Sequence, residues 1–380
     1  MTTEHLPFQL PPYPYDRVAA LGKLAEALPG GVVDCSIGTP CDPPLPAVIE
    51  ALSSSGAERG YPASAGSPTL LRAAASWLER RFGLPSVPVG AVAACVGTKE
   101  LVASVPQVLR LREPERDTVL YPAVSYPTYA MGAALAGCRA VPVAPLPGRL
   151  GGLDLASIAD SDARRALLLW SNSPSNPSGG LGDLASEAAW GRARGVPVFS
   201  DECYAEFTWD GPPRTVLQSG YEGVVAVHSL SKRSNLAGVR VGFYAGDLEL
   251  VEFLRSVRRH AGLMVPGPAQ AAGAVALNDD SHVEIQRTRY HERLTFLAGV
   301  LGEAGCPVDL PEGGFYLWVP VPTDRWTDAW AMAEDLARRG GILVSPGDLY
   351  GPGGAGFVRV AVVQPMDRLE LVAERLAASR

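Results

Sequence analysis

Short runs of apolar and β-branched residues alternate with helical segments through the middle of this chain, and this alternation constrains the fold most. The runs are AVAACV (91–96), TVLY (118–121), ALLLWS (166–171), VPVFS (196–200), VVAVHS (224–229) and VGFYAG (241–246). Helical patterns lie between most of them, for example over residues 71–82 and 185–195. Such alternation predicts an α/β fold with a mainly parallel, doubly wound sheet covered on both faces. Ligands of such sheets bind at the carboxyl ends of the strands.

The pattern changes after about residue 265. A long polar helix is predicted over residues 281–305, followed by strands over 315–321 and 357–363 with a helix over 326–340 between them. These elements predict a smaller α+β layer, which we expect the Pro-rich N-terminus to join. Because 380 residues exceed one small core, we expect two domains. The large domain would comprise residues 43–280, and the small domain residues 1–42 and 281–380.

Composition and charge exclude several classes of protein. The net charge is −7 and no basic run interleaves with aromatics, so nucleic acid is not an expected partner. No apolar stretch is long enough to span a bilayer, and the first residues lack the features of a signal peptide, so a cytoplasmic protein is expected. The five histidines and six cysteines show no metal-ligand spacing, so we expect free thiols and no metal site.

The strongest chemical signal is HSLSKRSNLAGVRVG, residues 228–242. A buried strand is predicted to end at Ser229, which places Lys232 at the mouth of the sheet between hydroxyls and near Arg240. A lysine that forms a Schiff base needs a partly desolvated amine on a rigid element. A phosphate nearby needs hydroxyl donors, here Ser229 and Ser231, and a guanidinium. Taken alone, the segment could equally be a surface loop with an incidental lysine.

Two more predicted strands end in polar residues. VPVFSDECYAEF carries Asp201 at the strand end and Tyr204 just after it, and SNSPSNPSGG carries Asn176. A carboxylate at a strand end can pair with a buried cation, although it can also simply cap the next helix. Asn176 with its following proline could form an ordinary turn.

VGTKE, residues 96–100, reads as a strand, a glycine and a helix start. Free amides at a helix N-terminus bind phosphate, so Gly97, Thr98 and Lys99 are candidate phosphate ligands through their backbone. The segment lacks the second glycine and the Lys-Ser/Thr pair of a Walker A loop. Downstream, Tyr126 in YPAVSYPTY could stack on an aromatic ligand or could be a core tyrosine.

An arginine interrupts the apolar strand FVRVAVV at Arg359. A buried guanidinium without a partner is costly, and a forked pairing with a carboxylate is a sound reason to place one there.

In their order, these motifs resemble those of the class I and II aminotransferases from residue 36 to residue 359. The resemblance implies the PLP-dependent transferase fold type I, with a seven-stranded sheet and pyridoxal 5′-phosphate (PLP) as cofactor. It implies that Lys232 carries PLP as a Schiff base and that Asp201 pairs with the ring nitrogen. Asn176 and Tyr204 would reach the phenolic oxygen, and Tyr126 would stack on the ring.

The same resemblance implies ligands for the phosphate and the substrate. The phosphate ligands would come from Gly97, Thr98, Lys99, Ser229, Ser231 and Arg240. Tyr61 would reach the phosphate of a neighbouring subunit, so that a homodimer shares its two active sites. Arg359 would bind the α-carboxylate of the substrate, with Gly38 of SIGTP approaching it and Asn176 helping to orient it.

Within the family, segments such as PPYPYDRVAALGKLA, VHSLSKRSNLAG and VSPGDLYGPGG resemble the actinobacterial succinyldiaminopimelate aminotransferases. This implies ping-pong transfer from L-glutamate to N-succinyl-2-amino-6-oxopimelate in lysine and meso-diaminopimelate synthesis. Cys41 and Asp42 after GTP, and the glycines of EGGFYLWVPV, depart from that pattern. The alternative is a paralogue of a specialised pathway that transaminates another amino acid or runs β/γ-elimination or replacement.

Other classes have less support. SLSK fits the S-x-x-K of serine acyl-transfer enzymes, with Ser229 and Lys232 as the reactive pair, but the companion motifs are absent. GPGGAG (351–356) precedes a predicted strand instead of opening a helix, which argues against a dinucleotide site. A non-catalytic regulator of this fold would carry a DNA-binding segment, and no helix-turn-helix or basic patch is visible.

Overall fold

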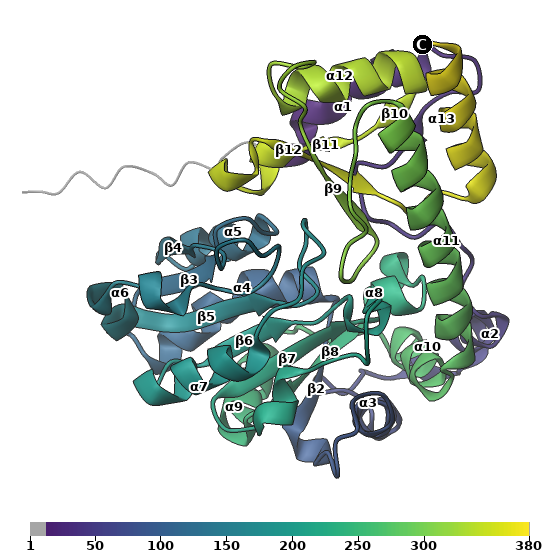
Figure 1. Ribbon diagram of the computed structural model, residues 1–380. Helices are drawn as coiled ribbons and strands as arrows, with labels where there is room; N and C mark the ends of the chain where they lie inside the picture. The colour runs from purple at the N-terminus through teal and green to yellow at the C-terminus, as the bar shows by residue number, and fades with distance from the viewer. Residues whose placement is uncertain (1–12, 380) are drawn as a thin grey trace, which may run out of the picture.

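The computed structural model describes residues 13–379, so residues 1–12 of the expected small domain lie outside the described part. Two layers of structure are visible in Figure 1. The lower one contains a large sheet with helices on both sides, and the upper one contains a small antiparallel sheet with helices around it.

The large sheet has seven strands in the order β2-β8-β7-β6-β5-β3-β4. They are β2 (Val92–Cys95), β3 (Thr118–Pro122), β4 (Arg139–Val143), β5 (Ala166–Asn172), β6 (Val198–Asp201), β7 (Val224–Ser229) and β8 (Gly242–Gly246). The strands from β3 to β7 pair in parallel, whereas β8 is antiparallel to both of its neighbours. The mainly parallel seven-stranded sheet of the fold type I prediction is therefore confirmed.

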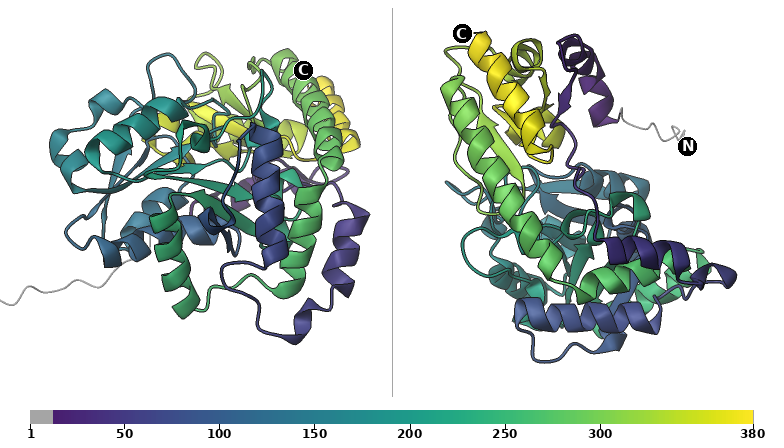
Figure 2. Two further views of the ribbon diagram at one scale, coloured as in Figure 1. Left: turned by 90° about the horizontal axis from the view of Figure 1, so that it is seen from below. Right: turned by 90° about the vertical axis from the view of Figure 1, so that its right-hand side faces the viewer.

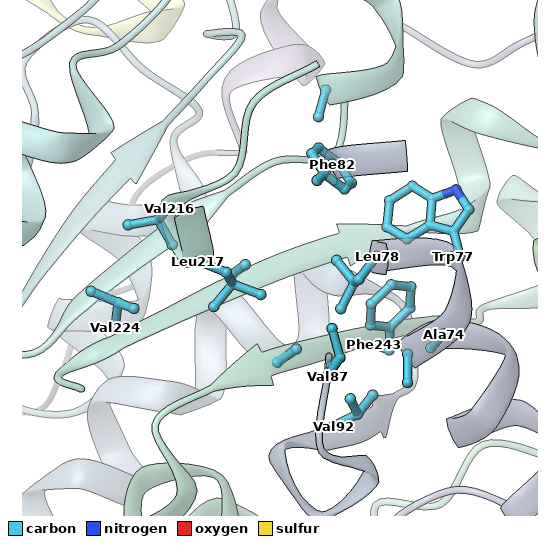
Figure 3. Packing of buried hydrophobic residues seen from close by; sticks show 14 of the residues in the cluster. Ala74, Trp77, Leu78, Phe82, Val87, Val92, Val216, Leu217, Val224 and Phe243 are labelled. Atoms are coloured by element: carbon cyan, nitrogen blue, oxygen red, sulfur yellow. The ribbon is translucent and has the colours of Figure 1, made fainter. Parts of the chain in front are cut away.

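Helices cover both faces of this sheet. They are α2 (Pro46–Ser54), α3 (Pro68–Phe82), α4 (Thr98–Arg112), α5 (Thr128–Leu135), α6 (Asp160–Arg165), α7 (Leu184–Arg194), α8 (Leu230–Arg233), α9 (Leu248–His260) and α10 (Gly267–Asn278). Successive residues of β7 point to opposite faces. Val224 and Ala226 join a core with α3, α7 and α10, part of which Figure 3 shows. Val225 and Val227 join a second core with α4, α5 and α9.

The small layer is built from both ends of the described chain. Its elements are α1 (Ala19–Glu26), β1 (Val33–Asp34), α11 (Ser281–Glu303), β9 (Tyr316–Pro320), α12 (Ala329–Gly340), β10 (Ile342–Leu343), β11 (Ser345–Pro346), β12 (Phe357–Ala361) and α13 (Met366–Ala378). Strand β12 pairs antiparallel with β9 and β11, and β1 pairs in parallel with β10. One hydrophobic core unites α1 with α12 and α13.

Helix α11 runs along the side of the molecule past both layers (Figures 1 and 2). Its C-terminal half contributes Leu294, Leu297 and Leu301 to the small core. Its N-terminal half contributes Val283 and Tyr290 to a cluster that also contains residues from the loop after β6. The helix therefore packs on both layers, and the domain boundary at residue 280 stays a prediction.

Three expectations about composition can be compared with the described residues. All six cysteines are free. No helix between residues 13 and 379 combines the length and the apolarity needed to cross a membrane. Within the same range, no group of three or more His, Cys, Asp or Glu side chains could hold a metal ion.

Candidate active site

Polar residues from several strand ends meet at one edge of the large sheet. Asn172, Asp201 and Ser229 are the last residues of β5, β6 and β7, and the register pairs Asn172 directly with Asp201. Because β8 is antiparallel to both β2 and β7, the end of β2 reaches the same edge and leads into Gly97. The small layer faces this edge and closes the site with residues of β9 and β12.

A cavity of about 350 Å³ opens between these elements. Most of the residues expected from the sequence line it, namely Gly38, Thr98, Lys99, Tyr126, Asn176, Asp201, Tyr204, Ser229, Ser231, Lys232, Arg240 and Arg359. Gly97 is the N-cap of the helix that begins at Thr98. Tyr61 does not line the cavity, and its side chain is 98% exposed.

Lys232 lies in the short helix α8, which follows β7 immediately. The Ser229 hydroxyl caps this helix by accepting a hydrogen bond from the Ser231 amide at 3.1 Å. The Lys232 ammonium donates to the carbonyl oxygen of Gly38. Burial, together with the positive charges of Arg359 and Arg240, lowers the pKa of Lys232 to about 8. The amine therefore loses its proton more readily than an exposed lysine, as a nucleophile and proton acceptor requires.

Asp201 is buried at the floor of the cavity. Its carboxylate accepts a hydrogen bond from the Tyr129 hydroxyl at 2.9 Å and one from the Cys203 amide at 3.3 Å. Burial raises its pKa, although the hydrogen bonds from Cys203 and Tyr129 oppose the shift. A buried acid of this kind is stabilised when a cation enters the site. Tyr129 was not expected, because its place in α5 and its stacking on Trp170 (5.2 Å) are typical of a core tyrosine.

Gly97 and Arg240 build an anion-binding corner at the start of α4. Gly97 has a φ of +74°, and a Cβ there would lie 2.2 Å from Nη2 of Arg240. Only glycine therefore lets this guanidinium approach the N-terminus of the 15-residue helix. The hydroxyls of Ser229 and Ser231 line the same cavity. Backbone amides, hydroxyls and a guanidinium at a helix N-terminus form a donor set that fits a phosphate.

Arg359 is fixed on the opposite side of the cavity, where it is only 2% exposed. It donates to Oδ1 of Asn176 at 2.8 Å and to the carbonyl oxygen of Ser36. Its guanidinium lies 4.4 Å from the ring centroid of Tyr316 and 4.7 Å from that of Tyr350. These contacts preorganise a guanidinium at the cavity wall, where it can bind a carboxylate.

Tyr316 shapes this side of the cavity and was missed by the sequence reasoning. Its hydroxyl lies 2.8 Å from that of Tyr204, and a Cβ at position 38 would come within 2.2 Å of it. Gly38 is thus required for the close approach of its loop to β9. Further lining residues that had not been expected are Tyr13, Ile37, Thr39, Val102, Tyr129, Asn172, Cys203 and Ala237. Asn172 ends a strand as Asp201 does, and Ile37 and Thr39 lie in the SIGTP segment, so these three had a signal that could have found them. No pattern distinguishes the other five from packing or loop residues.

Lys99 differs from its neighbours Gly97 and Thr98 because its side chain reaches aromatic residues. Its ammonium donates to the Tyr13 hydroxyl at 3.2 Å and lies 5.1 Å from the centroid of that ring. Burial opposes its charge, but the phenol oxygens of Tyr126 and Tyr13 outweigh this effect and raise the pKa of Lys99. The ammonium is therefore held at the mouth of the cavity as a cation.

Behind the cavity, His228 and Glu202 form a buried contact between β7 and the end of β6. His228 is packed, with Trp77, Phe82 and Phe243 around its ring. Its Nε2 lies 3.3 Å from the Glu202 carboxyl. Burial lowers the pKa of His228 to about 3 and raises that of Glu202 to about 8, so both groups are mostly neutral at pH 7.

Comparison with known proteins identifies the family. A family model described as aminotransferase class I and II matches residues 31–376. The chain belongs to this family. It is therefore a PLP-dependent aminotransferase, and the sequence resemblance that implied this enzyme class is confirmed.

Relatives of this aminotransferase cover nearly its whole length. A probable aminotransferase of Mycobacterium tuberculosis is 45% identical over 97% of this chain and 85% of its own. The 4-dedimethylamino-4-oxo-anhydrotetracycline transaminase of Streptomyces rimosus is 41% identical, over 97% and 99%. A solved structure of a probable N-succinyldiaminopimelate aminotransferase from Thermus thermophilus superposes with a TM-score of 0.85 at 31% identity, covering 96% of this chain and 100% of that one.

The residues of this aminotransferase fit PLP. The corner at Gly97 and Arg240 suits its phosphate, the buried Asp201 suits its protonated ring nitrogen, and Lys232 lies in the same cavity. Asn176 and Tyr204 line the same cavity and carry an amide N–H and a hydroxyl that can donate to the phenolic oxygen.

Proposed function

We propose that this aminotransferase transfers an amino group from L-glutamate to N-succinyl-2-amino-6-oxopimelate by a ping-pong mechanism. The charge balance of the cavity carries the glutamate half of the proposal. Four cationic side chains line it (Lys99, Lys232, Arg240 and Arg359), against the single carboxylate of Asp201 among the described lining residues.

Matching each charge with a ligand group leaves two cations for the substrate. The Arg240 guanidinium would pair with the phosphate, and the Asp201 carboxylate would pair with the protonated ring nitrogen. Lys232 would be bonded to the cofactor. Arg359 and Lys99 then remain, one buried and one at the exposed mouth. Since both line the cavity, they can receive the two carboxylates of a dicarboxylic amino acid such as glutamate.

The residues would then divide the work as follows. Bound PLP supplies an electron sink for the charge that develops at the substrate Cα. Burial lowers the pKa of Lys232 to about 8. Its amine would accept the proton from the substrate Cα and then donate it to the cofactor. Arg359 and Asn176, joined at 2.8 Å, would hold the α-carboxylate. The Asp201 carboxylate would keep the ring nitrogen protonated.

The acceptor rests on the sequence segments shared with succinyldiaminopimelate aminotransferases and on the similarity to the Thermus structure, a probable N-succinyldiaminopimelate aminotransferase. A second candidate is supported by a different relative. The Streptomyces rimosus transaminase, whose name gives a tetracycline intermediate, is more similar in sequence, at 41% against 31%. A paralogue that aminates a specialised metabolite is therefore the alternative acceptor assignment.

We also propose that the enzyme is a homodimer and that it acts in the cytoplasm. The dimer rests on the family resemblance of the segment around Tyr61, and the 98% exposure of this side chain leaves it accessible to a second subunit. In this arrangement Tyr61 would complete the phosphate site of the other subunit.

The acceptor is tested by incubating the holoenzyme with N-succinyl-LL-diaminopimelate and 2-oxoglutarate and measuring the glutamate formed. Glutamate alone, in a parallel cell, should discharge the visible absorbance of the cofactor. Glutamate formation in the first cell supports the full proposal. If glutamate removes the cofactor absorbance but the succinyl compound does not react, glutamate stays the proposed donor. The succinyl acceptor is then rejected in favour of the specialised paralogue. Inertness toward both rejects the proposal.

A further inference from the structure

Residues 36–42, here called the substrate loop, cross the cavity between Arg359 and Lys232. At its first end, the Ser36 amide donates to Asp34 at 2.9 Å, and the Ser36 carbonyl accepts from Arg359. In its middle, the Gly38 carbonyl accepts from Lys232. Ile37 and Thr39 line the cavity on either side of this contact. The position of the loop therefore sets the shape of the substrate site.

The other end of the substrate loop is held by Asp42. Its carboxylate accepts two hydrogen bonds from Arg293 of α11, at 2.6 and 2.8 Å, and one from Gln286 at 2.8 Å. The side chains of Asp42 and Arg293 are only 10% and 7% exposed. Burial raises the pKa of Asp42, but the hydrogen bonds and the charge of Arg293 outweigh it and lower the pKa. The pair is thus ionised, bidentate and largely shielded from water.

Gln286 extends this contact to the segment that carries Lys232. Its side chain is 2% exposed, and its Oε1 accepts a hydrogen bond from Asn235 at 3.2 Å. Asn235 lies three residues after Lys232 and has a φ of +56°, in the left-handed region. The next residue of α11, Arg287, donates to the carbonyl oxygens of Glu206 and Thr208 and so anchors this part of the helix.

We infer that Asn235, Gln286, Asp42 and Arg293 form a positioning network that fixes the substrate loop relative to Lys232. None of the four lines the cavity, so they act through the loop and not on the substrate. A buried, bidentate ion pair with a bridging amide has a defined geometry. It can therefore hold the substrate loop at a fixed position relative to the segment that carries Lys232. The network does not depend on which acceptor the enzyme uses. The measurement with glutamate rests on the proposed donor, whereas the measurement of loop exchange does not.

The test compares Asp42→Asn with Arg289→Gln in the holoenzyme. Asparagine keeps the size of the side chain but removes its charge. Arg289 is a matched control, because its guanidinium lies 3.8 Å from the same carboxylate but is 46% exposed. Two quantities are measured: hydrogen exchange of the substrate-loop amides by mass spectrometry, and the glutamate dependence of cofactor discharge in single turnover.

For Asp42→Asn we expect loop exchange to rise about tenfold and the apparent Kd for glutamate to rise about tenfold, since a charge-assisted pair is lost. The rate at saturating glutamate and the cofactor spectrum should stay within about twofold, because the reacting groups remain in place. Arg289→Gln should change neither quantity.

Unchanged loop exchange and glutamate affinity in Asp42→Asn would overturn the inference and reduce the pair to a stabilising contact. A fall in the saturating rate with unchanged affinity would also overturn it. Should Asp42→Asn fail to fold, Arg293→Lys decides by the same measurements, since it keeps the charge but loses the forked geometry.

Discussion

The partly buried amine of Lys232 should destabilise the apoenzyme. Its pKa falls from the ordinary 10.5 to about 8 in the folded protein. Each pH unit of displacement corresponds to about 1.4 kcal/mol, so holding the protonated amine in this site costs roughly 3 kcal/mol at pH 7. Lys232→Met removes that cost but also loses the hydrogen bond to Gly38, worth about 1 kcal/mol. The net expectation is a gain of about 2 kcal/mol in the free energy of unfolding.

The pH dependence gives the sign of this effect. Below pH 8 the amine is protonated in both the folded and the unfolded chain, and the full cost is present. As the pH rises from 8 to 10.5, the folded protein releases its proton before the unfolded chain does, so the wild type gains stability relative to Lys232→Met. The advantage of the variant should therefore disappear by about pH 10.5.

The assay is urea unfolding of the two apoproteins at pH 7, 9 and 10.5. Lys23→Met is the matched control, because Lys23 lies on the exposed face of α1. It should leave the unfolding free energy within about 0.5 kcal/mol of the wild type. A Lys232→Met apoprotein that is no more stable than the wild type at pH 7, or whose advantage does not change with pH, would refute the reasoning.

Four other changes have defined outcomes. Arg359→Lys should lower kcat/KM about 100-fold for both glutamate and alanine in steady-state assays, since it removes the buried fork that we propose binds the carboxylate common to both. Lys99→Gln should lower kcat/KM about fivefold for glutamate and leave alanine unaffected, because an exposed ion pair contributes only about 1 kcal/mol. Burial raises the pKa of Glu202 from 4.5 to about 8, so this group makes the wild type less stable as the pH rises from 4.5 to 8. Glu202→Gln should make the melting temperature depend less on pH over this range, as measured by thermal melts. Tyr61→Ala should weaken PLP binding about tenfold in an absorbance titration, if a hydrogen bond to the phosphate across the dimer is removed.

The large sheet was predictable from the sequence except at its edge. Six of its strands appear in the sequence as short apolar runs between helical segments. Examples are β5 and β7, where every residue is buried. The missed strand is β4, with mostly exposed residues and a proline at position 142. A proline is tolerated at an edge strand because one side of that strand needs no partner. Residues 140–143 (AVPV) do form an apolar run, but its proline argues against a central strand, and the sequence alone does not show that this strand lies at the edge.

The meeting of polar residues at one edge of the sheet was also predictable, because several of them end or directly follow a predicted strand. Asp201 and Ser229 end buried strands, and Gly97 follows another. The parallel order of β5, β6 and β7 brings such ends together without further information. Tyr129 was missed because it approaches Asp201 from the side of a helix, and no local pattern distinguishes it from its packing neighbours.

The substrate side depends on contacts between segments far apart in the chain. Arg359 stands opposite Trp318 in the β9–β12 pair, and Tyr316 stands opposite Ala361, a register that no single segment specifies. The substrate loop comes from the other end of the chain and reaches both through Ser36 and Gly38. These segments can vary without disturbing the strand ends that we propose hold the cofactor. A change of acceptor in this family would accordingly be made in the loop and the small layer, whereas the sheet would keep the chemistry.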